Sequence, residues 1–567
     1  MPRQVFLETF GCQMNELDSE LVLGQLRALG YRFTTDPGAA DVVLYNTCSV
    51  REHAEQKVWS RLGELALRKQ GQPALVVGVL GCMAERDGTD LIHRMPVVDI
   101  LCGPGELDKL PSLLDNALRT RASLLADPAG AGPPRTTPDP LNSARQVALQ
   151  GNTSRRSAAL AAAADNLELL DLSRSISPAD DQRANPASAY VRITRGCNKF
   201  CTYCVVPFTR GAEVHRPPDH IVDECKRLAD AGVIEVTLLG QTVNHYRFEQ
   251  SAAVTIGGLI QPQKGRSYAG GHRRDPFTSA STTTFADLLA RIHDRVPAIQ
   301  RLRFVTSYPR DFGDDVLEVI RDHPRICRYL HVPAQSGSDR ILRLMNRGYT
   351  VGEYLEFLDR AHARLHQPQL GRPLTVAGDI IVGFPTETDD DFAATVALVE
   401  RARYKNCFIF KYSPRPGTTA YDRLADDVPD QVKRRRNNDL LAIQGRISDE
   451  LSREQVGKTL PVFVEGVSRR EQKRRAAPRS CGNGAVPLTV GGRPAEHGGS
   501  ACAIDMEQVP ASEPGPADGT LQLSGRTDGD LIVFFDAPAA SAEDLIGRIV
   551  PVRIDRANRL SLHGARA

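Results

Sequence analysis

The chain has 567 residues, of which 41% are hydrophobic and 25% charged, and a formal net charge of +2. These values are typical of globular proteins, and the length predicts about three domains. No run of eighteen apolar residues and no basic start followed by an apolar stretch occurs, which argues against a membrane span and a signal peptide. Twelve cysteines in so long a chain do not indicate a disulfide scaffold. We therefore expect a cytoplasmic protein whose clustered thiols bind metal or do chemistry.

Residues 1–115 have the pattern of an α/β domain. Helical periodicity covers Leu17–Leu29 and Glu52–Leu67, and it alternates with β-rich apolar runs. These runs are Val5–Phe10, Asp41–Tyr45, Ala74–Leu80 and Val97–Leu101. Such alternation predicts an open, mostly parallel sheet.

A cysteine follows each of the first three of these predicted strands. These residues are Cys12, Cys48 and Cys82. The carboxyl ends of parallel strands share one edge of the sheet, where ligands bind, so the three thiols are expected to converge into a site. The alternative is three independent core or loop thiols. Cys102 follows the fourth strand and ranks below the other three as a ligand.

Residues 116–187 are rich in Ala, Pro, Ser and Asp and show poor periodicity, apart from an alanine-rich segment near Ala158–Leu170. This composition predicts a linker or insertion that is partly disordered.

Residues 188–425 again alternate between strands and helices. The predicted strands are Tyr190–Thr194, Glu235–Leu239, Arg301–Thr306, Tyr329–Val332, Thr375–Val382 and Cys407–Tyr412. Six β/α units predict an incomplete, TIM-like (β/α)6 barrel with its chemistry at the carboxyl ends of the strands. A Gly-, Ser-, Thr- and Arg-rich stretch at 247–284 interrupts the pattern and is expected to be a surface insertion.

The first strand of this barrel leads directly into a C-x3-C-x2-C motif, Cys197, Cys201 and Cys204. Thiolates select zinc or an iron–sulfur cluster. Structural zinc uses four protein ligands, and neither a second C-x2-C nor a nearby histidine supplies a fourth here. Three cysteines instead suit a cubane with one iron open to a substrate or cofactor.

A charged connecting helix is predicted at 426–455, and residues 456–567 have β-like sequence. Strands are expected at Pro461–Glu465, Asp530–Phe535 and Ile549–Ile554, with an insertion at 468–519. These strands predict a small antiparallel barrel of the OB-like kind that often binds oligonucleotides. A basic run could contact phosphates or could be a solvated charge run; it comprises Arg469, Arg470, Lys473, Arg474, Arg475 and Arg479.

The cysteine motif after a first barrel strand resembles the radical S-adenosylmethionine (SAM) superfamily. Further segments are similar to its methylthiotransferase family: ETFGCQMN (8–15), YNTCSVREHAEQKVW (45–59), GCNKFCTYCVVPFTRG (196–211), HVPAQSGSDRILRLMNRGYT (331–350) and DIIVGFPTET (379–388). The terminal barrel resembles a TRAM domain. The resemblance leaves out 116–187, 247–284 and 468–519.

The resemblance implies two [4Fe–4S] clusters. Cys197, Cys201 and Cys204 would hold the one that cleaves SAM to a 5′-deoxyadenosyl radical, and an auxiliary cluster on Cys12, Cys48 and Cys82 would hold the sulfur to be inserted. The implied reaction is methylthiolation of carbon 2 of N6-(dimethylallyl)adenosine at position 37 of tRNA, with two SAM molecules consumed. The implied partners are tRNA and an electron donor such as flavodoxin or ferredoxin, and we expect a monomer.

Candidate contacts to SAM follow from position at the strand ends. In the superfamily the segment after the second strand holds the amino group of the cofactor, which points to Gly240, Gln241 and Asn244. Ser307, Gln335 and Gly383 lie at neighbouring strand ends. A loop-capping role is the alternative for each.

Two other classes of function remain open at this point. A sibling methylthiotransferase would act on threonylcarbamoyl-adenosine in tRNA or on a ribosomal protein. A non-enzymatic, metal-bearing RNA-binding protein would use the terminal barrel. Cys225, Cys327, Cys407, Cys481 and Cys502 are expected to be ordinary structural thiols.

Overall fold

A computed structural model describes residues 2–49, 52–126, 145–150, 165–174, 185–265, 281–476, 489–490, 493–494 and 519–567. The chain divides into two compact units, Met1–Leu451 and Ser452–Ala567. Among the described helices, none combines the length and the apolar character that crossing a membrane requires.

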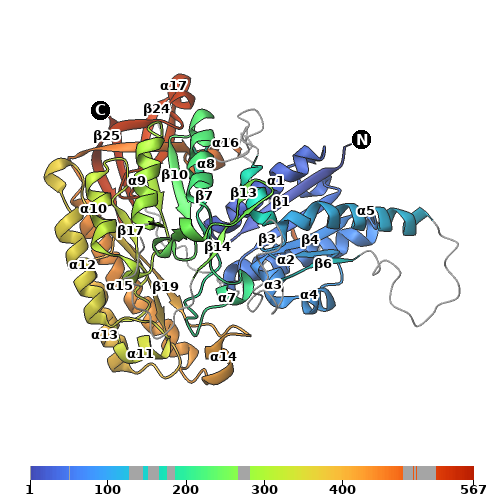
Figure 1. Cartoon of the computed structure of the whole chain (residues 1–567), viewed down its shortest axis with the longest axis horizontal. Helices are drawn as coiled ribbons and strands as arrows, with labels where there is room; N and C mark the ends of the chain where they lie inside the picture. The colour runs from blue at the N-terminus through green and yellow to red at the C-terminus, as the bar shows by residue number, and fades with distance from the viewer. Residues whose placement is uncertain are drawn as a thin grey trace. The chain divides into compact units, whose positions relative to one another are not determined.

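The first unit begins with the predicted parallel sheet (Figure 1, blue). Its strands lie in the order β2-β1-β3-β4-β5-β6, with bounds β1 Gln4–Phe10, β2 Arg32–Phe33, β3 Val42–Thr47, β4 Val76–Gly81, β5 Ile100–Cys102 and β6 Gln146–Ala148. Strands β3 and β4 are buried along their whole length, as apolar runs covered by helices on both faces should be. The helices are α1 Gln13–Ala28, α2 Glu52–Gly71, α3 Cys82–Asp87, α4 Thr89–Arg94 and α5 Leu110–Ala126.

Parts of the predicted linker at 116–187 form regular secondary structure. Helix α5 continues to Ala126 and so includes the first residues of this stretch. Strand β6 extends the sheet by pairing with β5 in parallel. A seven-residue helix, α6 (Asn166–Leu172), follows, with the Asp165 side chain accepting a hydrogen bond from the Glu168 amide as its cap. The rest of this stretch, 127–144, 151–164 and 175–184, lies outside the described residues.

The six predicted barrel strands form two parallel, three-stranded sheets, β7-β10-β16 and β17-β18-β19. Their bounds are β7 Ser188–Arg192, β10 Glu235–Leu239, β16 Arg301–Phe304, β17 Tyr329–His331, β18 Thr375–Val382 and β19 Asn406–Lys411. A parallel bridge between Leu302 and Ile326 connects the two sheets. The result is the incomplete barrel expected from the sequence.

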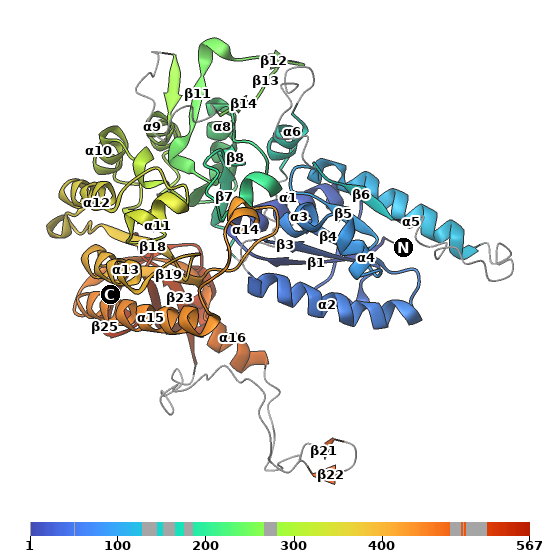
Figure 2. The same ribbon diagram turned by 90° about the horizontal axis from the view of Figure 1, so that it is seen from below.

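Helices cover one face of these sheets and complete the largest core cluster (Figure 2). The short helix α14 (Thr419–Arg423) packs instead through Ala420 in a smaller cluster with Phe384 and Tyr412. The covering helices are α8 Pro218–Asp230, α9 Phe285–Arg295, α10 Asp314–Asp322, α11 Asp339–Leu344, α12 Val351–Leu365, α13 Asp389–Ala402 and α15 Asp430–Arg453. Capping boxes begin three of them, with Thr284, Thr350 and Thr388 as caps.

Short elements surround the strand ends of the barrel. They are β8 Thr194–Arg195, α7 Val206–Thr209, β9 Val214–His215, η8 Val243–His245, η10 Pro309–Asp311 and η11 Pro368–Leu370. The predicted insertion at 247–284 supplies β11 Arg247–Glu249, β12 Thr255–Ile256, β13 Leu259–Ile260, β14 Gln263–Lys264 and β15 Thr282–Thr284. Strand β14 pairs with β9, so the insertion is built onto the segment that follows the cysteine motif.

The second unit is a closed barrel in the order β20-β23-β24-β26-β25. Its strands are β20 Thr459–Val467, β23 Thr520–Arg526, β24 Ile532–Pro538, β25 Ile549–Asn558 and β26 Ser561–Arg566, with α17 Ala539–Leu545 between two of them. The sequence predicted three of the five strands. The pairing of β24 with β26 is parallel, while the other ladders are antiparallel as expected.

The basic run lies partly on a helix, α16 (Arg469–Ala476). The buried Glu471 carboxylate accepts from Arg474 at 2.8 Å, while the Arg474 side chain remains 56% exposed. Arg479 lies outside the described residues.

A buried ion network joins the parallel-sheet domain to the barrel. Arg192 on β7 contacts Asp18 on α1 at 3.1 Å and Asp171 on α6 at 2.7 Å, and all three side chains are almost fully buried. Arg216 continues the network to Glu168 and Glu224, each at 2.8 Å. Buried charges are tolerated only when paired in this way.

Replacing Arg192 with Ala would leave two buried carboxylates without their shared partner. We expect the free energy of unfolding to fall by about 3–5 kcal/mol, the cost of breaking a buried ion pair. Urea denaturation followed by circular dichroism measures this change. Arg434→Ala is the control, because this exposed side chain pairs with Asp430 on the surface of α15 and its loss should cost only about 0.3–0.5 kcal/mol. Equal effects of the two substitutions would contradict the structural role of Arg192.

Candidate functional site

The C-x3-C-x2-C motif lies on a tight loop directly after β8. Cys197 is buried, and Cys201 and Cys204 are partly exposed. The turn depends on Gly196, whose φ is 68° and whose place a larger residue could not take, since a Cβ there would lie 2.1 Å from the Ala212 carbonyl oxygen. The Cys204 amide donates to the Cys201 carbonyl at 2.9 Å, so the three thiols are held on one compact turn.

Burial shapes the chemistry of these thiols. It raises the pKa of Cys197 well above its usual range, with Glu213 as a further cause. Burial, followed by the neighbouring Cys201, raises the pKa of Cys204 to about 12. Thiols that resist ionisation in isolation become thiolates when a metal replaces their protons. One Arg347 nitrogen lies 3.4 Å from the Cys201 sulfur and can donate to it.

The three cysteines of the first domain occupy the strand ends as predicted. Cys12 follows β1, Cys48 follows β3, and Cys82 begins α3 directly after β4. A hydrogen bond with Cys48 lowers the pKa of Cys12 to about 6 despite burial, and the positive charge of Arg210 adds to this effect. Burial raises the pKa of Cys82, which also interacts electrostatically with Cys12.

The two cysteine triplets lie next to one another. Helix α7, which follows Cys204, packs against α3, and Thr209 on α7 forms a hydrogen bond with Cys82. Arg210, the next residue, acts electrostatically on both Cys12 and Cys82 and donates to Asp18 at 2.9 Å. The loop of the first triplet therefore supplies the surroundings of the second.

Four of the other cysteines lie in the described part of the chain, outside the segments that carry the two triplets. The Cys102 thiol is buried and donates to the Glu106 carbonyl at 3.2 Å. Cys225, Cys327 and Cys407 are buried in the barrel domain. Cys481 and Cys502 lie outside the described residues.

The candidate cofactor residues at the strand ends differ in what they can offer. Asn244 is already paired at both ends of its amide with the Tyr308 backbone, at 2.8 and 2.9 Å. The hydroxyls of Ser307 and Thr194 are buried and, within the described part of the chain, have no hydrogen-bond partner. A Cβ at Gly240 would lie 2.1 Å from the Thr194 hydroxyl, so only glycine fits there. The two unpartnered hydroxyls fit a polar ligand at the strand ends.

Two further candidates have unusual backbone geometry. Gln335 is a non-glycine residue with a φ of 70°, and its amide donates to the Asp379 carbonyl at 2.8 Å. Gly383 has a φ of 69°, and a Cβ there would lie 2.3 Å from the Lys433 side chain. These contacts do not place Gln335 or Gly383 directly against a ligand. The Gln241 side chain, next to Gly240, is partly exposed.

The structure adds cationic residues that sequence reasoning missed. The Arg347 guanidinium lies 4.5 Å from the centre of the Tyr308 ring and 5.1 Å from that of Tyr349. Lys199, within the cysteine loop, pairs with Asp311 at 2.5 Å. Arg347 lies 143 residues beyond Cys204, so no local sequence pattern relates the two residues. Lys199 could have been found from its position inside the cysteine motif.

Two family profiles match the chain. Residues 4–103 match "Uncharacterized protein family UPF0004". Residues 191–399 match the radical SAM superfamily. The matches cover both cysteine triplets.

Curated relatives match over most of the chain. A tRNA-2-methylthio-N(6)-dimethylallyladenosine synthase from Rhodopirellula baltica is 42% identical over 83% of this chain and 86% of its own length. A protein of the same name from Burkholderia cenocepacia is 35% identical over 100% of this chain and 97% of its own length. Among solved structures, the radical SAM methyltransferase TsrM from Kitasatospora setae is similar with a TM-score of 0.43 and 16% identity, over 74% of this chain and 75% of that one.

Proposed function

Because the chain belongs to the tRNA-2-methylthio-N6-dimethylallyladenosine synthase family of radical SAM enzymes, we propose that it methylthiolates carbon 2 of N6-(dimethylallyl)adenosine at position 37 of tRNA. The relatives carry this activity in their names at 42% and 35% identity. The observation that supports it best is the adjacency of two cysteine triplets, joined through Thr209 and Arg210. Hydrogen abstraction and sulfur insertion at one carbon require two centres close together.

Membership of the radical SAM superfamily implies a [4Fe–4S] cluster and SAM as cofactors. In our proposal Cys197, Cys201 and Cys204 hold this cluster, and Cys12, Cys48 and Cys82 hold a second one. When bound, the first cluster and SAM supply the radical that removes hydrogen from the adenine, a C–H bond that no side-chain base could ionise. The chain's own part is to hold the thiolates at fixed positions and to keep water away.

For SAM we propose contacts with four strand-end residues, Gly240, Gln241, Ser307 and Thr194. The unpartnered hydroxyls of Ser307 and Thr194 support this placement, because buried polar groups are normally hydrogen-bonded. Asn244 would act as a positioning residue, since its amide already fixes the Tyr308 backbone. Gln335 and Gly383 remain candidates by position only.

The substrate base would bind on the barrel face turned away from the helices. Along β19, Cys407 and Ile409 pack into the core, while Phe408 and Phe410 are 43% and 41% exposed. Phe408 and Phe410 pair in register with Asp379 and Ile381 of β18. Exposed aromatic rings are the usual platform for a base that is unstacked from a tRNA loop.

The remaining parts of the proposal concern partners. The C-terminal barrel would bind tRNA, with the exposed arginines of α16 contacting phosphates. Flavodoxin or ferredoxin would deliver electrons to a cytoplasmic, monomeric enzyme.

Nucleosides from a deletion strain test the proposed substrate. Persistence of 2-methylthio-N6-(dimethylallyl)adenosine in that strain would refute this substrate in favour of a sibling reaction.

The division of labour between the triplets is testable with Cys201→Ala and Cys48→Ala. The wild type, reconstituted anaerobically, should contain about eight irons per chain, and each variant about four. Cys201→Ala should abolish 5′-deoxyadenosine formation. Cys48→Ala should retain part of it and lose the methylthiolated product.

Chemical iron analysis and liquid chromatography of the reaction products measure these outcomes. Cys225→Ala is the matched control, because this buried cysteine lies on α8, away from both triplets, and its variant should keep about eight irons. Equal loss of both products in Cys201→Ala and Cys48→Ala would refute the assignment of separate roles.

Arg347 should raise the reduction potential of the cluster held by Cys197, Cys201 and Cys204. Its positive charge, 3.4 Å from the Cys201 sulfur, favours the reduced and more negative form. Arg347→Gln should therefore lower the potential by several tens of millivolts, where about 59 mV is a tenfold change for one electron. A redox titration followed by electron paramagnetic resonance measures the shift. Arg310→Gln, a nearby arginine that donates to the Gly348 carbonyl instead, should leave the potential unchanged.

Phe410→Ala tests the proposed base platform. Stacking of a base on an aromatic ring contributes about 1–3 kcal/mol, so kcat/KM for isopentenylated tRNA should fall about tenfold or more. Formation of 5′-deoxyadenosine without tRNA should be unaffected. Leu370→Ala, at a 65% exposed apolar residue on η11, should change neither value. Unchanged kcat/KM in both variants would rule out this face as the substrate site.

A further inference from the structure

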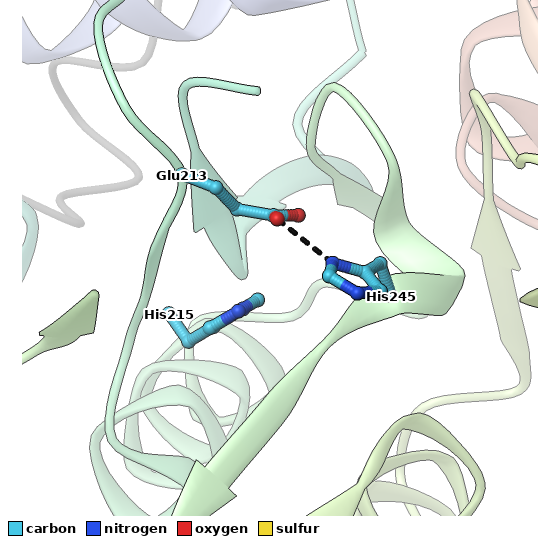
Figure 3. Close-up of side chains that lie close together, drawn as sticks. All are labelled: Glu213, His215 and His245. Carbon is cyan, nitrogen blue, oxygen red and sulfur yellow. Dashed lines mark hydrogen bonds and ion pairs between the residues drawn. The ribbon is translucent and has the colours of Figure 1, made fainter. Parts of the chain in front are cut away.

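A cluster of one carboxylate and two imidazoles lies beside the cysteine loop and takes no part in the proposed chemistry. Figure 3 shows the Glu213 carboxylate and the ring of His215 directed toward the same space as the ring of His245. One ligand atom from each of the three lies within 4.8 Å of those of the other two. Glu213 is fully buried, and His215 is 3% exposed.

The local structure explains why these residues converge. Glu213 and His215 are two positions apart in an extended segment that includes β9, so their side chains lie on one face. His245 ends η8, the short helix after β10. Glu213 and His245 form an ion pair of 2.7 Å, and the Thr242 hydroxyl donates to the second carboxylate oxygen at 3.0 Å.

These hydrogen bonds account for Glu213 and His245 but leave His215 unexplained. The Nδ1 atom of His215 is buried and has no hydrogen-bond partner among the residues that the structure describes. A buried polar atom without a partner is costly and calls for a missing partner, such as an ion. Next to the other ring nitrogen, Nε2, the space is kept open by Gly265, where a Cβ would lie 3.0 Å from Nε2 and 2.9 Å from Glu213 Oε2.

The protonation states suit metal binding. Burial lowers the pKa of His215 to about 4, so the imidazole is neutral at pH 7. Burial alone would raise the pKa of Glu213, but His245, His215 and Lys199 lower it to about 2, so the carboxylate is charged. A neutral imidazole such as that of His215 and an ionised carboxylate are forms that ligate metals.

From this geometry we propose that Glu213, His215 and His245 bind a zinc ion, separate from the two cysteine triplets. Two imidazole nitrogens and one carboxylate oxygen form a donor set that zinc accepts and that Mg²⁺ and Ca²⁺ do not prefer. Zinc has no redox chemistry, so the ion would exchange no electron with the neighbouring radical site. A water molecule would complete a tetrahedral coordination.

The ion would connect three segments around the cysteine loop. It would join β9 to η8 and hold the insertion strand β14, since the Gly265 amide donates to the Glu213 carbonyl at 2.8 Å. Asn198, between Cys197 and Cys201, accepts from the Glu213 amide at 3.1 Å and donates to the Gly265 carbonyl at 3.2 Å. The zinc site would thus fix the insertion against the cysteine loop.

The test uses the holoenzyme with its iron–sulfur clusters assembled. It is incubated anaerobically with one equivalent of zinc sulfate, freed of excess metal and analysed for zinc and iron by mass spectrometry. We expect about one zinc per chain in the wild type, and at least about tenfold less in His215→Ala and in His245→Gln. Iron should remain at the wild-type level in both variants. If His215→Ala loses iron through misfolding, His245→Gln still tests the site, because its amide can bond to Glu213.

X-ray absorption at the zinc edge distinguishes zinc in the proposed site from zinc bound in a vacant cysteine site. The proposed site gives only nitrogen and oxygen neighbours at about 2.0–2.2 Å, whereas cysteine sulfur would appear at about 2.3 Å. His293→Gln is the matched control, because His293, Asp294 and His323 form a second such group, in which Asp294 is 66% exposed. The proposal would be overturned if the wild type bound no zinc or if the zinc had sulfur neighbours. It would also be overturned if zinc were lost in His293→Gln but not in His215→Ala or His245→Gln.

Discussion

Asp18 is the residue on which the arrangement of the two cysteine triplets depends. Its two carboxylate oxygens accept from different arginines, Arg192 on the first barrel strand and Arg210 at the end of the cysteine loop. Asp18 belongs to α1, the helix that begins next to Cys12. One buried carboxylate therefore ties the strand that carries the first triplet to the helix that starts at the second. Because buried ion pairs tolerate little displacement, this contact fixes the two triplets relative to one another.

Much of this arrangement follows from local sequence, and the rest does not. Strand periodicity placed Cys12 and Cys48 at strand ends, and parallel-sheet topology then brought them into contact. The role of α6 was hidden, since seven residues in an Ala- and Pro-rich stretch give little periodicity. Its importance lies in the charges of Glu168 and Asp171, whose partners Arg216 and Arg192 lie 48 and 21 residues away. Sequence spacing carries no information on such pairs.

The strand-end residues show the same limit at the level of single side chains. Position alone made Asn244 and Ser307 equal candidates for the cofactor. The structure separates them, because Asn244 is satisfied by the Tyr308 backbone while the Ser307 hydroxyl has no partner. Likewise, His215 and His245 are 30 residues apart, and only the fold shows that they meet at Glu213. Which polar group is free for a ligand depends on three-dimensional pairing and cannot be obtained from residue type.

Each triplet has one partly buried arginine, and the two arginines are held differently. Arg210 shares its charge with Asp18, so the thiols of Cys12 and Cys82 feel a partly neutralised cation. Arg347 rests on the faces of two tyrosine rings, and its hydrogen bonds within the described residues go to a tyrosine hydroxyl, a backbone carbonyl and the Cys201 sulfur. Aromatic faces hold a cation without cancelling its charge. The charge of Arg347 is therefore less compensated than that of Arg210, which in our proposal would favour electron uptake by the cluster that Cys201 helps to hold.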